Sequence, residues 1–292
     1  MKKRKIALIS AILLSGLMTL NYGCKKDDEV KEFDTQSSQD NSLAEATFND
    51  IMEITNQAIE NGSSGLSTFR KVNTQGTFMS TCATLDITPD SSGQGGSIVI
   101  DFGPYSCLCD DGRYRKGVIH VTYTATYRDS GAIITMNPQS YFVGRDTTNM
   151  YQVYGTKTLI NKGHNAAGHL WYTIDVNGEI HDRNHAVMSW TSQRTREWLA
   201  GESTMGTGGY VDDVYSITGT SSGTTFEGKS YTANITKALV FKLDPACRHI
   251  VEGIFELTPS GLPTRTLDYG NGTCDNDATI TVNGATFNIK LR

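Results

Sequence analysis

Apolar and polar residues alternate along most of the chain after residue 77, and this period of two constrains the fold more than any other feature. Ile119, Val121 and Tyr123 are separated by single polar residues. The same spacing recurs later, in Tyr231, Ala233, Ile235 and in Leu239, Phe241, Leu243. Successive side chains of a strand point to opposite faces, so each segment has one apolar and one polar face. The pattern predicts antiparallel strands that bury one face only.

The composition agrees with a chain built mainly from strands. It contains 36 Thr, 29 Gly and 13 Tyr but only 6 Pro among 292 residues. Thr and Tyr favour strands, whereas Gly favours tight turns. We therefore predict a mainly β protein with one large antiparallel sheet or meander of about ten or more strands, over roughly residues 71–292.

One segment before the strands has a helical period instead. Apolar residues recur at helical spacing between residues 44 and 59, and Asn61-Gly62 supplies a stop signal. Ser42 and Glu45 have the spacing of a capping box, in which each side chain bonds the other residue's backbone. The sequence predicts one N-terminal amphipathic helix at 42–61, which buries its apolar stripe on the sheet.

Two Asn-Gly dipeptides test the register of the strands. Around Asn283-Gly284, a two-residue turn pairs Val282 with Ala285 and places every apolar residue on one face. Around Asn177-Gly178, the same turn would pair apolar with polar residues. We therefore predict a tight hairpin at 283–284, and a longer or bulged loop at 177–178.

The N-terminus has the pattern of an export signal. Four basic residues, Lys2 to Lys5, precede an apolar run from Ile6 to Leu20, which is short for a membrane span. The run ends before Gly23-Cys24, as in a bacterial lipobox, and Lys25-Lys26-Asp27-Asp28-Glu29 follows. We expect a signal peptide at 1–23, acylation of Cys24, a flexible tether at 24–41 and a single β-rich domain at 42–292.

An internal repeat suggests how the cysteines pair. Residues 85–89 (LDITP) match residues 255–259 (FELTP), and a DFG or DYG triplet follows in each copy. One Cys precedes and one follows within each copy, which predicts Cys82–Cys107 and Cys247–Cys274 disulfides. Cys109 could replace Cys107 as the partner of Cys82. A zinc site at Cys107 and Cys109 is disfavoured, because C-x-C is not the usual ligand spacing.

Charge and motifs exclude several functions. The net charge of −5 offers no basic face, which argues against nucleic-acid partners. The chain has no phosphate-binding loop or dinucleotide fingerprint, and we expect no cofactor and no metal. Residues 201–206 resemble a nucleophile elbow, but Met205 stands where Gly is required. No catalytic residue is therefore assigned.

The segment from Trp190 to Trp198 is the best candidate for ligand contact. Four of its residues have equal parity on a strand: Trp190, Arg194, Arg196 and Trp198. Exposed, they would offer stacking and bidentate hydrogen bonds to a sugar. A structural cation–π ladder is the simpler interpretation. The rival function is a hydrolase using acidic residues such as Glu197, Glu202, Asp212 or Asp213.

Several segments together resemble a family of uncharacterised Bacteroidota surface lipoproteins. They are Ser189-Trp190, Arg194-Thr195-Arg196, Asp212-Asp213-Val214-Tyr215, Ile217-Thr218-Gly219 and residues 265–274, along with the lipobox Cys24 and its export-like Lys-Lys-Asp-Asp-Glu sequence. The resemblance implies outer-membrane anchoring, surface exposure and one β-rich domain, but brings no activity. The expected function is non-enzymatic binding or structural support at the outer membrane, with a glycan or an outer-membrane protein as partner.

Overall fold

The computed structural model describes residues 35–63, 82–204, 212–242, 247 and 250–291. The predicted signal peptide, Cys24 and the export-like sequence lie outside these residues. The compact unit extends from Asp34 to Arg292. No helix within the described part of the chain is long and apolar enough to cross a membrane.

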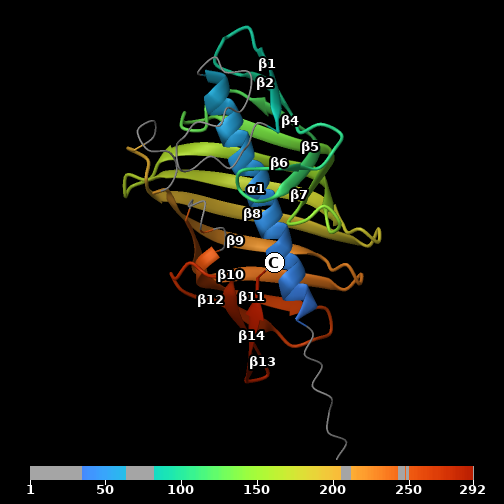
Figure 1. Ribbon diagram of the computed structural model, residues 1–292. Coiled ribbons are helices and arrows are strands. Elements are labelled where there is room, and N and C mark those ends of the chain that lie inside the picture. The colour runs from blue at the N-terminus through green and yellow to red at the C-terminus, as the bar shows by residue number, and fades with distance from the viewer. Residues whose placement is uncertain (1–34, 64–81, 205–211, 243–246, 248–249, 292) are drawn as a thin grey trace, which may run out of the picture. The chain divides into compact units, whose positions relative to one another are not determined.

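One helix and fourteen strands make up the described part of this unit (Figure 1). The helix α1 spans Gln36–Ser63. The strands are β1 (Thr84–Pro89), β2 (Gly96–Asp101), β3 (Cys107–Leu108), β4 (Tyr114–Tyr123), β5 (Ile133–Gly144), β6 (Tyr151–His164), β7 (Leu170–His181), β8 (Val187–Ala200), β9 (Val214–Thr224), β10 (Ser230–Lys242), β11 (Ile250–Pro259), β12 (Arg265–Asn271), β13 (Asp277–Val282) and β14 (Ala285–Lys290).

The strands form one antiparallel meander, which confirms the predicted fold class. Thirteen strands follow one another across the sheet in chain order, and β3 pairs with β4 beside this path. The hairpin at Asn283-Gly284 has the predicted register, with Val282 opposite Ala285 and Ile280 opposite Phe287. Both turn residues have positive φ, 49° and 77°, as a two-residue hairpin turn requires.

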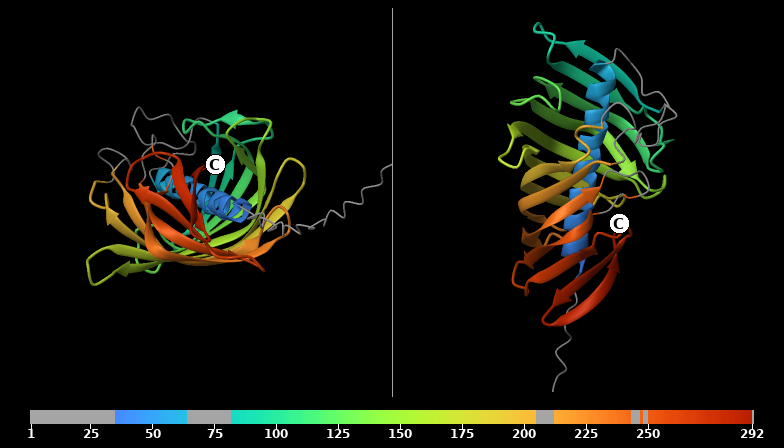
Figure 2. Two further views of the ribbon diagram at one scale, coloured as in Figure 1. Left: turned by 90° about the horizontal axis from the view of Figure 1, so that it is seen from below. Right: turned by 90° about the vertical axis from the view of Figure 1, so that its left-hand side faces the viewer.

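The sheet curves around α1, which crosses the strands on the inner face (Figure 2). Register shifts interrupt the β4–β5, β5–β6, β9–β10 and β10–β11 pairings. Extra residues of this kind bend a strand and increase its twist. The shift in β4 contains Gly117, where a Cβ atom would lie 1.8 Å from the carbonyl oxygen of Ser140. Only glycine allows the two strands to approach so closely there.

The inner face and α1 share one hydrophobic core. Phe48 of α1 stacks on Trp190 of β8, with ring centroids 5.5 Å apart. Trp190 has a glycine directly opposite it on each neighbouring strand, Gly178 on β7 and Gly223 on β9. A Cβ on Gly178 would lie 2.3 Å from the Phe48 ring. Small residues beside the large indole therefore make the space that the helix occupies.

Two predictions about local structure are wrong. Asn177-Gly178 forms no loop, because both residues lie inside β7 and pair with β6 and β8. The helix begins at Gln36, so Ser42 is not its cap, and residues 36–41 belong to the helix instead of a tether. Ser42 instead exchanges a hydrogen bond with the Tyr269 hydroxyl. The predicted apolar stripe is buried, and its members include Ala44, Phe48, Ile51, Met52, Ala58 and Ile59.

The two predicted disulfides are present, Cys82–Cys107 and Cys247–Cys274. Each joins the two ends of its own repeat unit, β1–β2 or β11–β12. Asp101 and Asp268 fix equivalent turns, since each accepts a hydrogen bond from the glycine two residues later. Cys109 lies outside both disulfides and is buried, with its sulfur 3.9 Å from the Cys107 carbonyl oxygen.

Candidate functional site

The four residues of the predicted ligand strip share one face of β8, but that face is the buried one. Trp190 and Trp198 are each 2% exposed, Arg194 is 6% exposed and Arg196 is 1% exposed. All four lie on the inner face, which packs against α1. The prediction of an exposed ligand-contacting strip is therefore wrong, and these residues are part of the core.

Three of the four strip residues have a polar partner on α1 that explains their position. The Trp190 indole donates a hydrogen bond to Asn41 Oδ1 at 2.9 Å. Arg194 pairs with Glu45 at 2.6 Å, and Arg196 pairs with Glu53 at 2.9 Å. The Arg196 guanidinium also lies 3.5 Å from the centroid of the Tyr215 ring. Burial of an arginine is costly unless it is paired, so these contacts explain why α1 carries acidic residues on a buried side.

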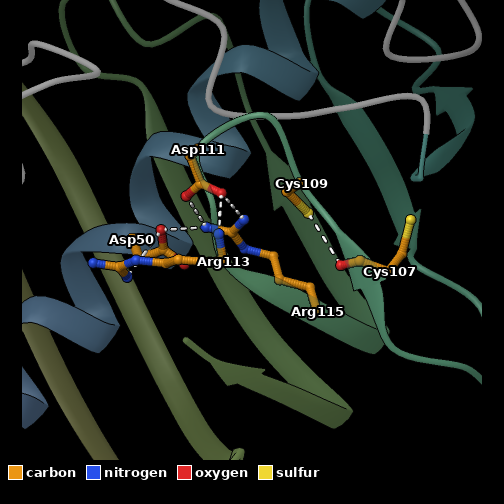
Figure 3. A network of polar contacts seen from close by, with 6 residues as sticks. All are labelled: Asp50, Cys107, Cys109, Asp111, Arg113 and Arg115. Carbon is orange, nitrogen blue, oxygen red and sulfur yellow. Dashed lines mark hydrogen bonds and ion pairs between the residues drawn. The ribbon is translucent and has the colours of Figure 1, made fainter. Parts of the chain in front are cut away.

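A third buried ion pair joins α1 to the hairpin of β3 and β4 (Figure 3). Arg115 donates to Asp50 of the helix and to both oxygens of Asp111, at 2.6 to 2.7 Å. Burial would raise the pKa of Asp111, but the hydrogen bonds and charge of Arg115 outweigh it and lower that pKa. The network fixes this hairpin against the helix.

Lys157 of β6 is another buried cation between the sheet and the helix. Its ammonium group donates to the Phe48 carbonyl oxygen at 2.9 Å and lies 3.5 Å from Asn49 Oδ1. Burial, and after it the positive charge of Arg196, lower the pKa of Lys157 to about 7 against the opposing charges of Glu45 and Glu53. The lysine therefore serves the packing of the helix.

The acidic residues of the hydrolase hypothesis have different partners among the described residues. Asp213 lies on the inner side, 1% exposed, and accepts a hydrogen bond from Tyr215 at 3.1 Å. Glu197 accepts hydrogen bonds from His169 and Asn165, both at 2.7 Å, and points away from the core, since its neighbour Trp198 points inward. The exposed Asp212 binds the Thr204 hydroxyl, and Glu202 pairs with His164.

Asp213 has the most perturbed carboxyl group of the four. Burial raises the pKa of Asp213 to about 7, and the negative charge of Glu53 acts in the same direction, whereas the hydrogen bond from Tyr215 opposes it. Its Oδ1 atom has no hydrogen-bond partner among the described residues. Tyr215 in turn packs against Trp198, with ring centroids 5.3 Å apart. Asp213 therefore borders the aromatic pair of Tyr215 and Trp198 and also feels the charges of Glu53 and Arg196.

The outer face of the sheet carries a polar groove that the sequence analysis did not assign. The groove has a volume of about 750 Å³ and crosses strands β6 to β11. One row of directly paired residues runs along it: Thr156, Asn177, Thr191, Ser222, Thr232 and Thr258. A second row runs beside the first: Thr158, Asp175, Gln193, Thr220, Asn234 and Glu256.

The groove is chemically uniform. Most of its lining residues are Ser, Thr, Asn or Gln, Asp175 and Glu256 are its charged residues, and none of its lining residues is Lys, Arg or aromatic. Cross-strand bonds preset part of the surface, such as Thr191 to Ser222 at 2.8 Å. Asp175 and Glu256 are four strands apart in the same row, about 19 Å at the usual strand spacing. That distance is too long for the carboxyl pair of a glycosidase.

The sequence did contain a signal for this groove. The polar members of the alternating pattern, such as Thr232 and Asn234, are the outward residues of the same strands whose apolar members form the core. The sequence alone does not show that these residues align across six strands, because the alignment depends on the register of every pair of neighbouring strands.

Comparison with known proteins does not bear on the function. No family model, no curated protein and no solved structure matches the chain.

Proposed function

We propose that the chain is a lipid-anchored surface protein that binds an extended, uncharged or amino-bearing polysaccharide across the outer face of its sheet. The polar groove over β6 to β11 carries this proposal. Hydroxyl and amide side chains both donate and accept hydrogen bonds, which suits the hydroxyl groups of sugars. The site is a binding surface, with no catalytic role assigned to any residue.

The arrangement of the rows favours a polymer that lies across the strands. Neighbouring strands are about 4.8 Å apart, so a ligand crossing them meets a new pair of polar side chains at each step. The side chains project from a continuous sheet and are held by cross-strand pairing. Preorganisation of this kind lowers the entropic cost of binding.

The charges of the groove select among polymers. Asp175 and Glu256 are negative, and no cationic residue lines the surface to offset them. An anionic polysaccharide would be repelled, whereas amino groups would be attracted. We expect soluble chitosan to bind more tightly than a neutral β-glucan, and alginate to bind least. Calorimetric titrations at two salt concentrations measure this order.

Salt supplies the internal control for these titrations. Added salt should reduce the advantage of chitosan and leave the neutral glucan unaffected, because screening acts only on charge. Tighter binding of alginate than of the neutral glucan would contradict the proposed site, as would release of shortened glucan chains during the titration.

The anchor is part of the same proposal and rests on the sequence. Acylation of Cys24 would hold the domain at the outer membrane, and Lys25 to Glu29 favour the outer leaflet. We predict that the Cys24→Ala chain leaves the membrane fraction, and that protease added to intact cells cuts the wild-type chain. Retention of the variant in membranes, or protection from protease while a known surface lipoprotein is cut, would contradict this part.

A further inference from the structure

The meander has two ends, and they differ in how they can pair. Among the described strands, β1 and β14 each have a neighbour on one side only, and they lie at opposite ends of the sheet (Figure 1). An unpaired edge presents N–H and C=O groups to any strand that approaches it. Which residues present these groups follows from the hydrogen bonds on the paired side.

On β14 the even-numbered residues face the open edge. The two-residue turn directs the Ala285 N–H toward Val282 on β13. Past the other end of the strand, the Leu291 N–H donates to the Asn276 carbonyl oxygen at 2.8 Å. Backbone groups alternate in direction along an antiparallel strand. The backbone groups of Thr286, Asn288 and Lys290 therefore point away from β13.

The side chains of these residues lie on the outer face and are exposed, whereas Ala285, Phe287 and Ile289 are on the inner side. In a hydrogen-bonded pair of opposite residues on antiparallel strands, the backbone groups of both residues must point toward the partner strand. Their side chains must also lie on the same face of the sheet. A second β14 strand, turned by a two-fold rotation, satisfies both conditions.

On β1 the relation between edge and face is the opposite of that on β14. The Asp90 N–H donates to Gly95 at 2.9 Å, so Asp86 and Thr88 face β2, and Leu85, Ile87 and Pro89 face the open edge. The residues of β1 whose backbone groups face the open edge alternate with residues on the outer face, so their own side chains are not on that face. On β14 the side chains of the edge-facing residues are on the outer face. An antiparallel joint of β14 with β1 would therefore set outer face beside inner face. Pro89 also lacks an N–H, which weakens this edge for pairing.

We propose that two copies of the chain join through β14 about a two-fold axis at Asn288. In this register Asn288 lies opposite its copy and Thr286 lies opposite Lys290 of the other chain. The three facing pairs supply about six main-chain hydrogen bonds, two for each pair. The two sheets become continuous, and Phe287 of each chain lies opposite Ile289 of the other on the inner side. Isologous two-fold contacts are the commonest in homo-oligomers.

The side chains suit this joint. Each Asn288 amide has a donor and an acceptor for the other. The two Lys290 residues lie at opposite ends, about 14 Å apart along the strand direction, which is beyond the screening length in physiological salt. Each Lys290 also pairs with Asp277 of its own hairpin. The strand contains no proline and no bulge that would prevent edge pairing.

Cysteine cross-linking of the full chain tests this register. Directly opposed facing residues have Cα atoms about 5.5 Å apart, within disulfide range. Under mild oxidation, the Asn288→Cys chain should give a band at twice the mass of the single chain on a non-reducing gel. Thr286→Cys alone should give none, whereas a mixture of Thr286→Cys with Lys290→Cys should cross-link.

A second pair of variants tests the backbone contribution without cross-linking. Asn288→Pro removes an edge-facing N–H but no bond to β13, so the fold should persist while sedimentation shows monomer in place of dimer. Asn288→Ser keeps the N–H and should retain the dimer. Equal cross-linking of Thr286→Cys and Asn288→Cys, an unaffected Asn288→Pro dimer, a monomeric wild type, or a ladder of higher oligomers would overturn the proposal.

Discussion

At the scale of single residues, the buried ion pairs explain why the strip on β8 is core. Parity along the strand placed Trp190, Arg194, Arg196 and Trp198 on one face, and this was predictable from the sequence. Which face is buried was not, because two arginines usually indicate exposure. The decisive information lay about 150 residues earlier, where Glu45 and Glu53 occupy a buried side of α1.

Asp213 gives this scale a testable consequence. Its pKa is raised to about 7 in the folded protein from 3.8, so the folded state holds the proton more tightly than the unfolded state. Stability from this group is therefore full below about pH 4 and is lost as the pH rises toward 7. We predict that Asp213→Asn, which stays neutral, removes this decline from urea unfolding midpoints measured between pH 4 and 7.

Asp212→Asn is the matched control, because Asp212 is exposed and binds Thr204. It should leave most of the pH dependence of the wild type in place, because the charge of Asp212 contributes least to the raised pKa of Asp213. If Asp213→Asn unfolds with the same pH dependence as the wild type, the buried carboxyl does not titrate in this range, and its assigned pKa is wrong.

At the scale of elements, the two Asn-Gly dipeptides adopt different structures. Asn283-Gly284 forms a hairpin turn whose flanking strands pair apolar with apolar residues. Asn177-Gly178 failed that pairing test, and the structure places it within β7, where Gly178 makes room for Phe48. The failed test ruled out a tight turn. It could not show a continuous strand, because the glycine is needed to make room for a helix that lies more than 120 residues earlier in the chain.

The helix shows a similar limit. Its apolar stripe was predictable, but Ser42 and Glu45 carried a misleading capping signal. The structure uses Ser42 to bind Tyr269 and Glu45 to bind Arg194. Tertiary partners thus explain two polar residues that local rules assign to a helix start.

The internal repeat predicted how the cysteines pair, but it did not predict how its strands are oriented in the sheet. Both disulfides close within their own unit as predicted. Yet β11 is nine places from β1 in a sheet where every neighbour is antiparallel, so the two strands run in opposite directions. The copies therefore share turns and cross-links but not a common orientation in the sheet.

At the scale of the whole molecule, the two faces of the sheet have separate roles. The inner face packs on α1 through aromatic residues and paired charges, and the outer face keeps two aligned polar rows. The fold class was predictable from alternation alone. The groove was not, because it requires the register of six strands and the bending of the sheet.

The central claim, that the outer groove binds polysaccharide, is tested most directly by paired variants on neighbouring strands. Asn177→Ala with Gln193→Ala removes two amides from the groove rows. Thr195→Ala with Thr218→Ala changes a directly paired outward couple beside the groove. Titration calorimetry with chitosan should show affinity about tenfold or more lower for the first double variant and unchanged for the second, since each lost hydrogen bond costs about 1 kcal/mol. Equal affinity of the groove variant and the wild type, or an equal loss in both double variants, would contradict the account.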